Sequence, residues 1–359
     1  MNVLNILNTI RENSSALYQE RVPEATQQNI KDVGNAIMNF ESTQNEFCDA
    51  LVNRIAFTVV SNRRFKNPLA VLKKGGKPFG TTIEELYTNP VKAVTYNGSK
   101  TDDMLTVTKP DTKTIFHTRN RQDKYPVSIS TPQLQTAFTS LNELSKFVTS
   151  VINAMYSGDE MDEYLLMRNT IADAVANSKL KSFEMEYDGE ETTAKALVKF
   201  VKTLSGNFTF PSNAYNGYNV LNAANIEAGK TTEAITWTPG ENQICIIRTD
   251  VDASTDVEVL AKAFNMEKTD FLKRKFIVDS FGDADTLMVI CDENIFEVRD
   301  DLYQVRSFDN GSNLTTNYWL HHWQTLSISL FGNAVAIKQK AVAEATAEAT
   351  AEPEPEGEE

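Results

Sequence analysis

The chain has 359 residues, of which 41% are hydrophobic and 23% are charged, close to the average for globular proteins. Its length exceeds the usual size of one domain, so we expect one elaborate domain or two closely joined ones with a sizeable core. No apolar run reaches the roughly 18 to 20 residues of a membrane span, and the start of the chain lacks the pattern of a secretion signal. The sequence therefore predicts neither a membrane protein nor a secreted one.

The formal net charge of −14 is distributed unevenly along the chain. Residues 341–359 contain seven glutamates and no lysine or arginine, whereas residues 61–130 contain thirteen basic residues against six acidic ones. A basic segment set against an acidic remainder suits a contact in which part of one subunit lies on its neighbour. The final segment has too few apolar side chains to build a core, so we expect a disordered acidic tail at 341–359.

The first 45 residues are polar, and apolar residues recur with helical spacing only briefly, as at Leu7 and Ile10. We expect an N-terminal arm with one or two short helices. Residues 46–60 are the first strongly apolar segment, and the branched and aromatic side chains of residues 55–60 predict a strand. The globular body should begin there.

Residues 61–130 are rich in turn-forming and basic residues. Strand-like stretches lie at 93–96 and 112–117, and the Asn-Gly pair at 97–98 is a favoured hairpin turn. A segment with so little apolar content cannot build its own core. We therefore expect a long two-stranded loop, which needs support from elsewhere because an isolated hairpin is marginally stable in water.

Apolar residues then recur with helical period from 141 to 177, interrupted by a break at 157–159. This pattern predicts one long helix with a kink, preceded by a helix start at Thr131-Pro132. The residues expected on its core-facing side are Leu141, Leu144, Val148, Val151, Ile152 and Met155.

Helices and strands are mixed in the second half of the chain, which predicts an α+β fold. A second amphipathic helix is expected at 192–204 and a short one at 256–264. Apolar runs predict buried strands at 244–247, 276–278 and 287–291, and a long strand-like pattern covers 317–337.

The chemistry-bearing residues show no enzyme signature. The sequence contains no nucleophile elbow, Walker loop or HExxH motif, and no spacing singles out a pair of carboxylates. The adjacent His321 and His322 would point to opposite faces of a strand, which makes a poor metal clamp. Cys48, Cys245 and Cys291 lie far apart and should be buried free thiols. We expect no catalytic residues, no metal and no cofactor.

Several short sequence stretches are unremarkable singly, but together, in the order in which they follow one another, they indicate a family. They include TIEELYT at 82–88, FHTRNRQ at 116–122, INAMY at 152–156, VLAKAFNM at 259–266, TDFL at 269–272, WQTLS at 323–327 and NAVA at 333–336. In this order, from about residue 46 to 337, they resemble the major head proteins of short-tailed, double-stranded DNA phages of the phi-29 type.

The resemblance implies the HK97-type capsid fold and a division of the chain into its parts. These are an N-terminal arm at 1–45, the start of a peripheral domain at 46–60, an extended loop at 61–130, a peripheral domain with a spine helix at 131–189, an axial domain at 190–295, strands returning to the peripheral domain at 296–340, and the tail.

The resemblance also implies a function. Such a protein assembles in the host cytoplasm into hexamers and pentamers, which form the icosahedral or prolate head shell of a virion around double-stranded DNA. Its implied partners are copies of itself, a scaffolding protein, a portal protein and the packaged DNA. Three other functions stay open: a cellular nanocompartment (encapsulin-like) shell protein, a cytoplasmic enzyme and a nucleic-acid-binding module.

The basic residues at the start of the expected loop are candidates for an inter-subunit contact. They are Arg63, Arg64, Lys66, Lys73, Lys74 and Lys77. Exposed ion pairs contribute only about 0.2–1 kcal/mol each, so these charges would set register and pairing specificity between subunits. A solvated surface loop and a contact with packaged DNA are the two other interpretations.

Overall fold

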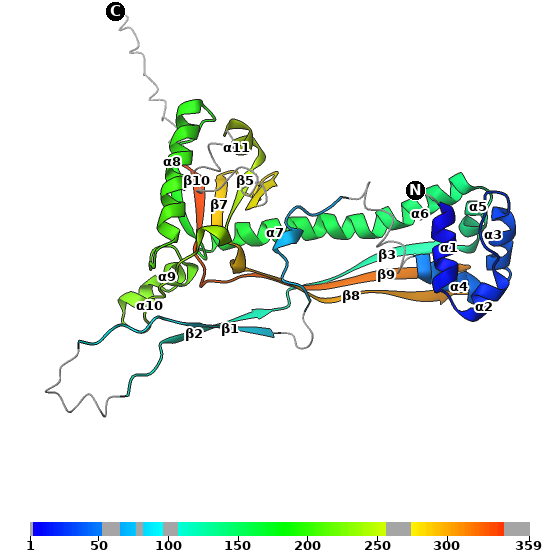
Figure 1. Cartoon of the computed structure of the whole chain (residues 1–359), viewed down its shortest axis with the longest axis horizontal. Coiled ribbons are helices and arrows are strands. Elements are labelled where there is room, and N and C mark those ends of the chain that lie inside the picture. Colours follow the sequence, from blue (N-terminus) through cyan, green and yellow to red (C-terminus); the bar gives the residue numbers. More distant parts are fainter. Residues whose placement is uncertain (1–2, 52–64, 77–81, 96–106, 256–273, 341–359) are drawn as a thin grey trace, which may run out of the picture.

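The computed structural model describes residues 3–51, 65–76, 82–95, 107–255 and 274–340. Figure 1 shows an elongated molecule, with a group of short helices at one end and a five-stranded sheet at the other. A long helical rod runs between the two ends, beside a narrow three-stranded sheet, and a separate hairpin extends away from the body. Among these residues no helix is long and apolar enough to cross a lipid bilayer.

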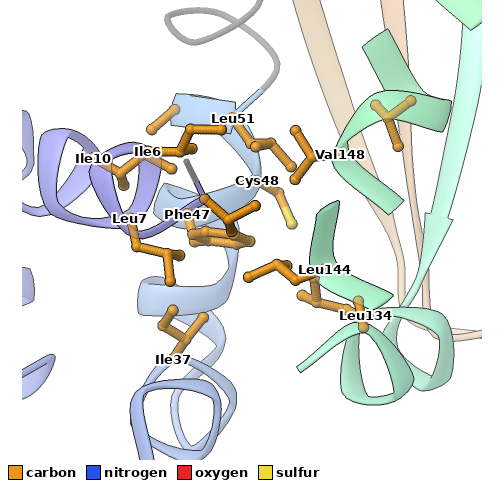
Figure 2. Close-up of a cluster of buried hydrophobic side chains, with 14 of the residues drawn as sticks. Ile6, Leu7, Ile10, Ile37, Phe47, Cys48, Leu51, Leu134, Leu144 and Val148 are labelled. Atoms are coloured by element: carbon orange, nitrogen blue, oxygen red, sulfur yellow. The ribbon is translucent and has the colours of Figure 1, made fainter. Parts of the chain in front are cut away.

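Four short helices form the N-terminal end: α1 (Val3–Asn13), α2 (Ala16–Arg21), α3 (Ile30–Met38) and α4 (Glu41–Ala50). They pack against α5 (Thr131–Ala137) and α6 (Leu141–Ile152) around a shared apolar cluster. Figure 2 shows Ile6, Phe47 and Leu144 meeting in this cluster. The structure has more helix here than the sequence predicted, because helices of 6 to 11 residues show too few apolar repeats to reveal their period and gain their stability from packing.

The long rod consists of α6, a π-helical turn (Asn153–Ser157) and α7 (Gly158–Ala176). The predicted long helix is thus confirmed, and the π-helical turn lies at the predicted break. The preceding helix α5 begins with a capping box formed by Ser130 and Gln133, one residue before the predicted cap.

The five-stranded sheet has the order β4–β10–β7–β5–β6. Its strands are β4 (Lys181–Met185), β10 (Ala334–Gln339), β7 (Thr286–Asp292), β5 (Gln243–Arg248) and β6 (Lys275–Val278). Helix α7 covers one face, and α8 (Glu191–Phe208) covers the other, so β7 is buried along its whole length. Burial on both faces explains the unbroken apolar runs in the sequence. Cys245 and Cys291 are buried free thiols in this sheet, and Cys48 is one in the helical cluster, as predicted.

Short elements connect the sheet. They are α9 (Gly217–Leu221), α10 (Ala223–Glu227), α11 (Thr249–Ser254) and three 3-10 turns (Ala70–Leu72, Gly240–Asn242 and Glu293–Ile295). Gly217 begins α9 so close to the preceding chain that a Cβ atom there would lie 2.0 Å from the carbonyl oxygen of Lys179. Only glycine fits at this crossing.

The narrow sheet has the order β3–β9–β8, with β3 (Arg121–Ser130), β9 (Thr315–Ile328) and β8 (Phe296–Asn310) all antiparallel. One face of β9 carries, in sequence, Tyr318, Leu320, His322, Gln324, Leu326 and Ile328. A β-bulge between Asp300 and Leu302 shifts the register of β8 against β9. The pattern predicted at 317–337 is therefore two strands in different sheets, whereas β8 was expected only from the resemblance, as part of the returning strands at 296–340.

The hairpin consists of β1 (Thr82–Thr88) and β2 (Thr112–Thr118), which pair with Thr82 opposite Thr118. The predicted strand at 112–117 is confirmed, whereas residues 93–95 are not in a strand. Residues 121–130, expected in the loop, belong to the narrow sheet. The strand predicted at 55–60, the turn at 97–98, the helix at 256–264 and the tail at 341–359 lie outside the described residues.

Candidate functional site: a hairpin, its anchors and a charged junction

The two faces of the hairpin have different surroundings. On one face Glu85, Tyr87, Lys113 and His117 contact the rest of the chain. The residues on the other face are exposed. The hairpin is therefore attached to its own subunit by one face and presents the other outward.

The first anchor lies at the base of the hairpin, next to the end of β9. His117 is buried, and its ring nitrogens lie 2.9 Å from Glu85 Oε2 and 2.8 Å from Ser327 Oγ. Ser329 donates a hydrogen bond of 2.7 Å to the other oxygen of Glu85. Burial alone would raise the pKa of Glu85, but the hydrogen bonds from His117 and Ser329 outweigh it and lower this pKa below its ordinary value.

The second anchor joins the far end of the paired region to the loop at 231–235. Asp111 accepts hydrogen bonds from Thr232 and from Lys113, whose Nζ lies 2.9 Å away. Hydrogen bonds from Thr232, Lys113 and Asn89 lower the pKa of Asp111 to about 2. Asn89 also bonds the backbone on both sides of residue 234, donating to the Glu233 carbonyl and accepting from the Ile235 amide. Between the two anchors, the Tyr87 ring stacks on Phe331 with centroids 5.0 Å apart.

The outward face carries exposed apolar side chains. Leu86 is 62% exposed and Phe116 is 64% exposed, although both lie within paired strands. Beyond the paired region, Val91, Val94 and Val107 are also exposed. A row of large apolar groups on a slender projection marks an interaction surface.

The six predicted basic residues have different positions. Lys66 is exposed, while Lys73 and Lys74 bind acidic residues of their own chain. Lys73 lies 2.6 Å from Glu163 and 3.0 Å from Asp300, and Lys74 pairs with Glu297. Arg63, Arg64 and Lys77 lie outside the described residues.

Residues 65–76 form a strap across α7 and β8, so we name this segment the strap. Leu69 and Leu72 are buried in the apolar cluster beneath the five-stranded sheet. The amide of Lys74 donates to the carbonyl of Val298, and Gly76 makes a β-bridge with Asp300. The strap thus brings Lys73 to Glu163 of α7 and Lys74 to Glu297 of β8.

The strap, α7 and the narrow sheet meet in a cluster of charged and polar side chains, which we call the charged junction. Its members are Asn67, Lys73, Arg121, Asp159, Glu163, Asp300, His322 and Gln324. Arg121 binds Asp159 with a nitrogen–oxygen distance of 2.8 Å, and both side chains are buried. Gln324 donates to both Glu163 and Asp300. Glu163, Asp300 and His322 are close enough together to hold a metal ion, but the ammonium group of Lys73 already binds both carboxylates.

No motif or spacing in the sequence singles out the charged junction as a site. Its members come from five separate segments of the chain, and no spacing relates them. One signal was present: His322 and Gln324 interrupt an otherwise apolar face of β9, between Leu320 and Leu326. A polar pair at such a position has to be satisfied by partners from other elements.

The predicted core face of the long helix lies against the helical cluster. Leu144, Val148, Val151 and Met155 are buried, and Leu141 is half-buried beside them. The side chain of Ile152 lies outside the described part of the chain. An adjacent groove of about 580 Å³ runs between β3, α5 and α6. Its lining includes Val127, Pro132, Phe147 and Val151.

Comparisons with known proteins agree on one family. The family model described as Phi29-like phage major capsid protein matches residues 7–338. The major capsid protein of Bacillus phage PZA is 35% identical over 336 residues, covering 92% of this chain and 72% of that protein. The major capsid protein of Streptococcus phage Cp-1 is 29% identical over 352 residues, covering 92% of both.

Solved structures agree on the fold. A chain from the capsid structure of Staphylococcus phage Andhra superposes with a TM-score of 0.63 at 16% identity, covering 77% of this chain and 85% of that one. A chain from the structure of the head fiber and inner core protein gp22 of bacteriophage P68 gives a TM-score of 0.57 at 14% identity, covering 78% and 86%. The fold is the HK97-type capsid fold, and the chain belongs to the Phi29-like phage major capsid protein family.

Proposed function

We propose that this chain builds a phage head shell by repeating one contact, in which the outward face of the hairpin lies on the next subunit, to give hexamers and pentamers. The head-shell function and the place in the virion follow from the family. A nanocompartment shell and a cytoplasmic enzyme are less well supported, because the matching family and its curated members are phage major capsid proteins.

The proposed contact rests on one observation. Leu86 and Phe116 are exposed on a hairpin whose other face is already anchored to its own subunit. Burying two such side chains contributes about 1.5–3 kcal/mol each, more than exposed ion pairs provide. The groove beside α6, whose lining is part apolar and part polar, lies toward the opposite end of the molecule, as Figure 1 shows for α5 and α6 relative to β1 and β2. The hairpin cannot reach this groove within its own subunit.

Complementary surfaces at opposite ends produce a head-to-tail contact, which closes into rings when the rotation between subunits allows it. We therefore assign the groove lined by Val127, Phe147 and Val151 as the acceptor for the hairpin of a second copy. The exposed basic residue Lys66, together with Arg63, Arg64 and Lys77, is proposed to set register against the acidic neighbour.

Assembly tests the proposed contact. The double variant Leu86→Asp/Phe116→Asp should stay folded, because both side chains are exposed, and should lose ordered particles in negative-stain microscopy. Phe210→Asp, which replaces an exposed phenylalanine outside the hairpin, is the matched control and should still assemble. Particles formed by the double variant at the wild-type yield would contradict the contact.

Cysteine crosslinking tests the acceptor. Leu86→Cys combined with Ser150→Cys in the groove should give disulfide-linked multimers under oxidation, and each single variant should not. Crosslinking that occurs only within one chain, or not at all in assembled particles, would show that the hairpin binds elsewhere.

The further partners are a scaffolding protein, a portal protein and packaged double-stranded DNA. Membership of the capsid family supports all three. A head shell needs a scaffolding protein to set its shape and a portal protein through which DNA enters, and it encloses the packaged DNA. DNA contact should be non-specific and weak, since the chain carries a net charge of −14. Comparing particles formed with and without a co-expressed scaffolding protein tests the first partner: identical uniform shells in both cases would remove the need for it.

A further inference from the structure

We infer that His322 is held as a doubly protonated imidazolium inside the charged junction, so that the contact between α7 and the narrow sheet loosens when the pH rises. The histidine is only 2% exposed. Its Nδ1 lies 2.6 Å from Asp159 Oδ1, and its Nε2 lies 3.1 Å from Asp300 Oδ1.

The geometry fixes the protonation state. An ionised carboxylate only accepts hydrogen bonds, and a neutral imidazole carries one N–H and one lone pair. With carboxylate oxygens at both ring nitrogens, a neutral His322 would set one lone pair against an acceptor in a buried site. The imidazolium donates to both and leaves neither nitrogen unpaired.

Charge balance gives an independent reason. The buried and half-buried carboxylates of the junction are Asp159, Glu163 and Asp300, and the permanent cations are Arg121 and Lys73. Among these groups the charge is balanced only when His322 supplies the third positive charge, and the more exposed Asp123, which also binds Arg121, adds a further negative charge. An uncompensated buried charge is costly, so the folded protein favours the protonated ring.

Of the other groups around the ring, one opposes this state. From β3, Arg121 opposes protonation, while Asp123 and Tyr125 bind Arg121. From α7, Asp162 accepts from the Tyr125 hydroxyl. From β8, the Tyr303 ring meets the His322 ring edge-on at 4.7 Å. Burial alone would lower the pKa of His322, but the hydrogen bonds to Asp159 and Asp300 outweigh it and raise this pKa above its ordinary value.

The direction of the pH effect follows. A histidine whose pKa is raised by folding stabilises the fold fully below its unfolded value of about 6.5, and this stabilisation is lost as the pH rises through the folded value. Between the two values the folded state holds one proton more than the unfolded state, so the folding equilibrium constant falls about tenfold per pH unit. This pH dependence arises within one subunit and does not depend on where the hairpin binds.

The test uses the full-length chain with labelled histidine. Its only histidines are His117, His321 and His322, so nitrogen NMR can follow each ring separately. At pH 6.5 both nitrogens of His322 should carry protons, and the ring should titrate above this pH. A His322 ring that titrates at or below pH 6.5 would overturn the inference without any variant.

Unfolding of the unassembled subunit provides the second readout. Between pH 6.5 and 8.5 the folding equilibrium constant of the wild type should fall. In His322→Gln this fall should be smaller by the contribution of the one proton that His322 binds on folding. His321→Gln makes the same change one residue away on the opposite face of β9 and should keep the wild-type slope. Equal slopes for wild type and His322→Gln would overturn the inference.

Discussion

The two halves of α7 meet the rest of the subunit in different ways. The first half presents Asp159 and Glu163 to the charged junction, whereas the second half packs Met167, Ile171 and Val175 against the five-stranded sheet. Apolar contacts are non-directional, and their strength follows the area buried. The charged contacts depend on every partner being present, since each removed group leaves another buried and unpaired. The apolar contacts of the second half of α7 therefore tolerate small changes in geometry, whereas the charged contacts of its first half specify a single geometry.

The largest effect should come from breaking the charged half. Arg121→Ala removes one of the two cations that bind the buried Asp159 and leaves the junction with an uncompensated negative charge, so we expect the free energy of unfolding to fall by about 3–5 kcal/mol. Chemical denaturation of the unassembled subunit measures this change. A loss below about 1 kcal/mol would show that water or a rearranged partner compensates Asp159.

The apolar half should respond in a graded way. Ile171→Ala should reduce the free energy of unfolding by about 2–5 kcal/mol and Ile171→Val by about 0.5–1.5 kcal/mol, because the loss follows the volume removed. Both losses should be the same at pH 6 and pH 8. A loss that depends on pH would mean that the two halves of α7 are coupled.

The hairpin anchors should have a smaller and more local effect. Glu85→Gln weakens the hydrogen bonds with His117 and Ser329, and for this half-exposed carboxylate we expect a loss of about 1.5 kcal/mol. The loss should show as faster hydrogen exchange in β1 and β2, with little change in the five-stranded sheet. Uniformly faster exchange would indicate that the hairpin is part of the global folding unit.

The smallest effect is expected for an exposed ion pair. Lys146 and Glu143 are three residues apart on α6, and their charged atoms lie 2.7 Å apart in solvent. Lys146→Ala should change the free energy of unfolding by only about 0.2–0.5 kcal/mol. A larger loss of stability would show that Lys146 also stabilises the groove beside α6 through contacts other than its ion pair with Glu143.

The sequence was informative where a pattern is long and local. The rod from 141 to 176 and the helix α8 follow from helical periodicity, because each buries one continuous face, and the strands β5 and β7 follow from unbroken apolar runs, because they are buried on both faces. The N-terminal helices were underestimated, since short helices owe their stability to packing that the local sequence does not display.

The residue pattern alone does not predict strand β8, for a specific reason. Its apolar residues Phe296 and Val298 lie at even positions, whereas Tyr303 and Val305 lie at odd ones, so no single alternation runs through the strand. The charged junction was missed because it depends on tertiary contacts among five segments. Lys73 and Lys74 were expected to face a neighbour, and only the fold reveals acidic partners within the same chain.

The bulge at Asp300–Leu302 has a consequence for the whole length of the narrow sheet. On β9 every even residue from 318 to 328 faces the same side, but on β8 the side that carries Phe296 and Val298 continues with Tyr303 and Val305. The extra residue, Asp301, shifts the alternation of β8 by one position, so that even-numbered apolar residues before it and odd-numbered ones after it face the same side. Deleting Asp301 would therefore remove the bulge and leave a regular strand, in which Tyr303 and Val305 keep their side while the ion pair between Arg119 and Asp301 is lost.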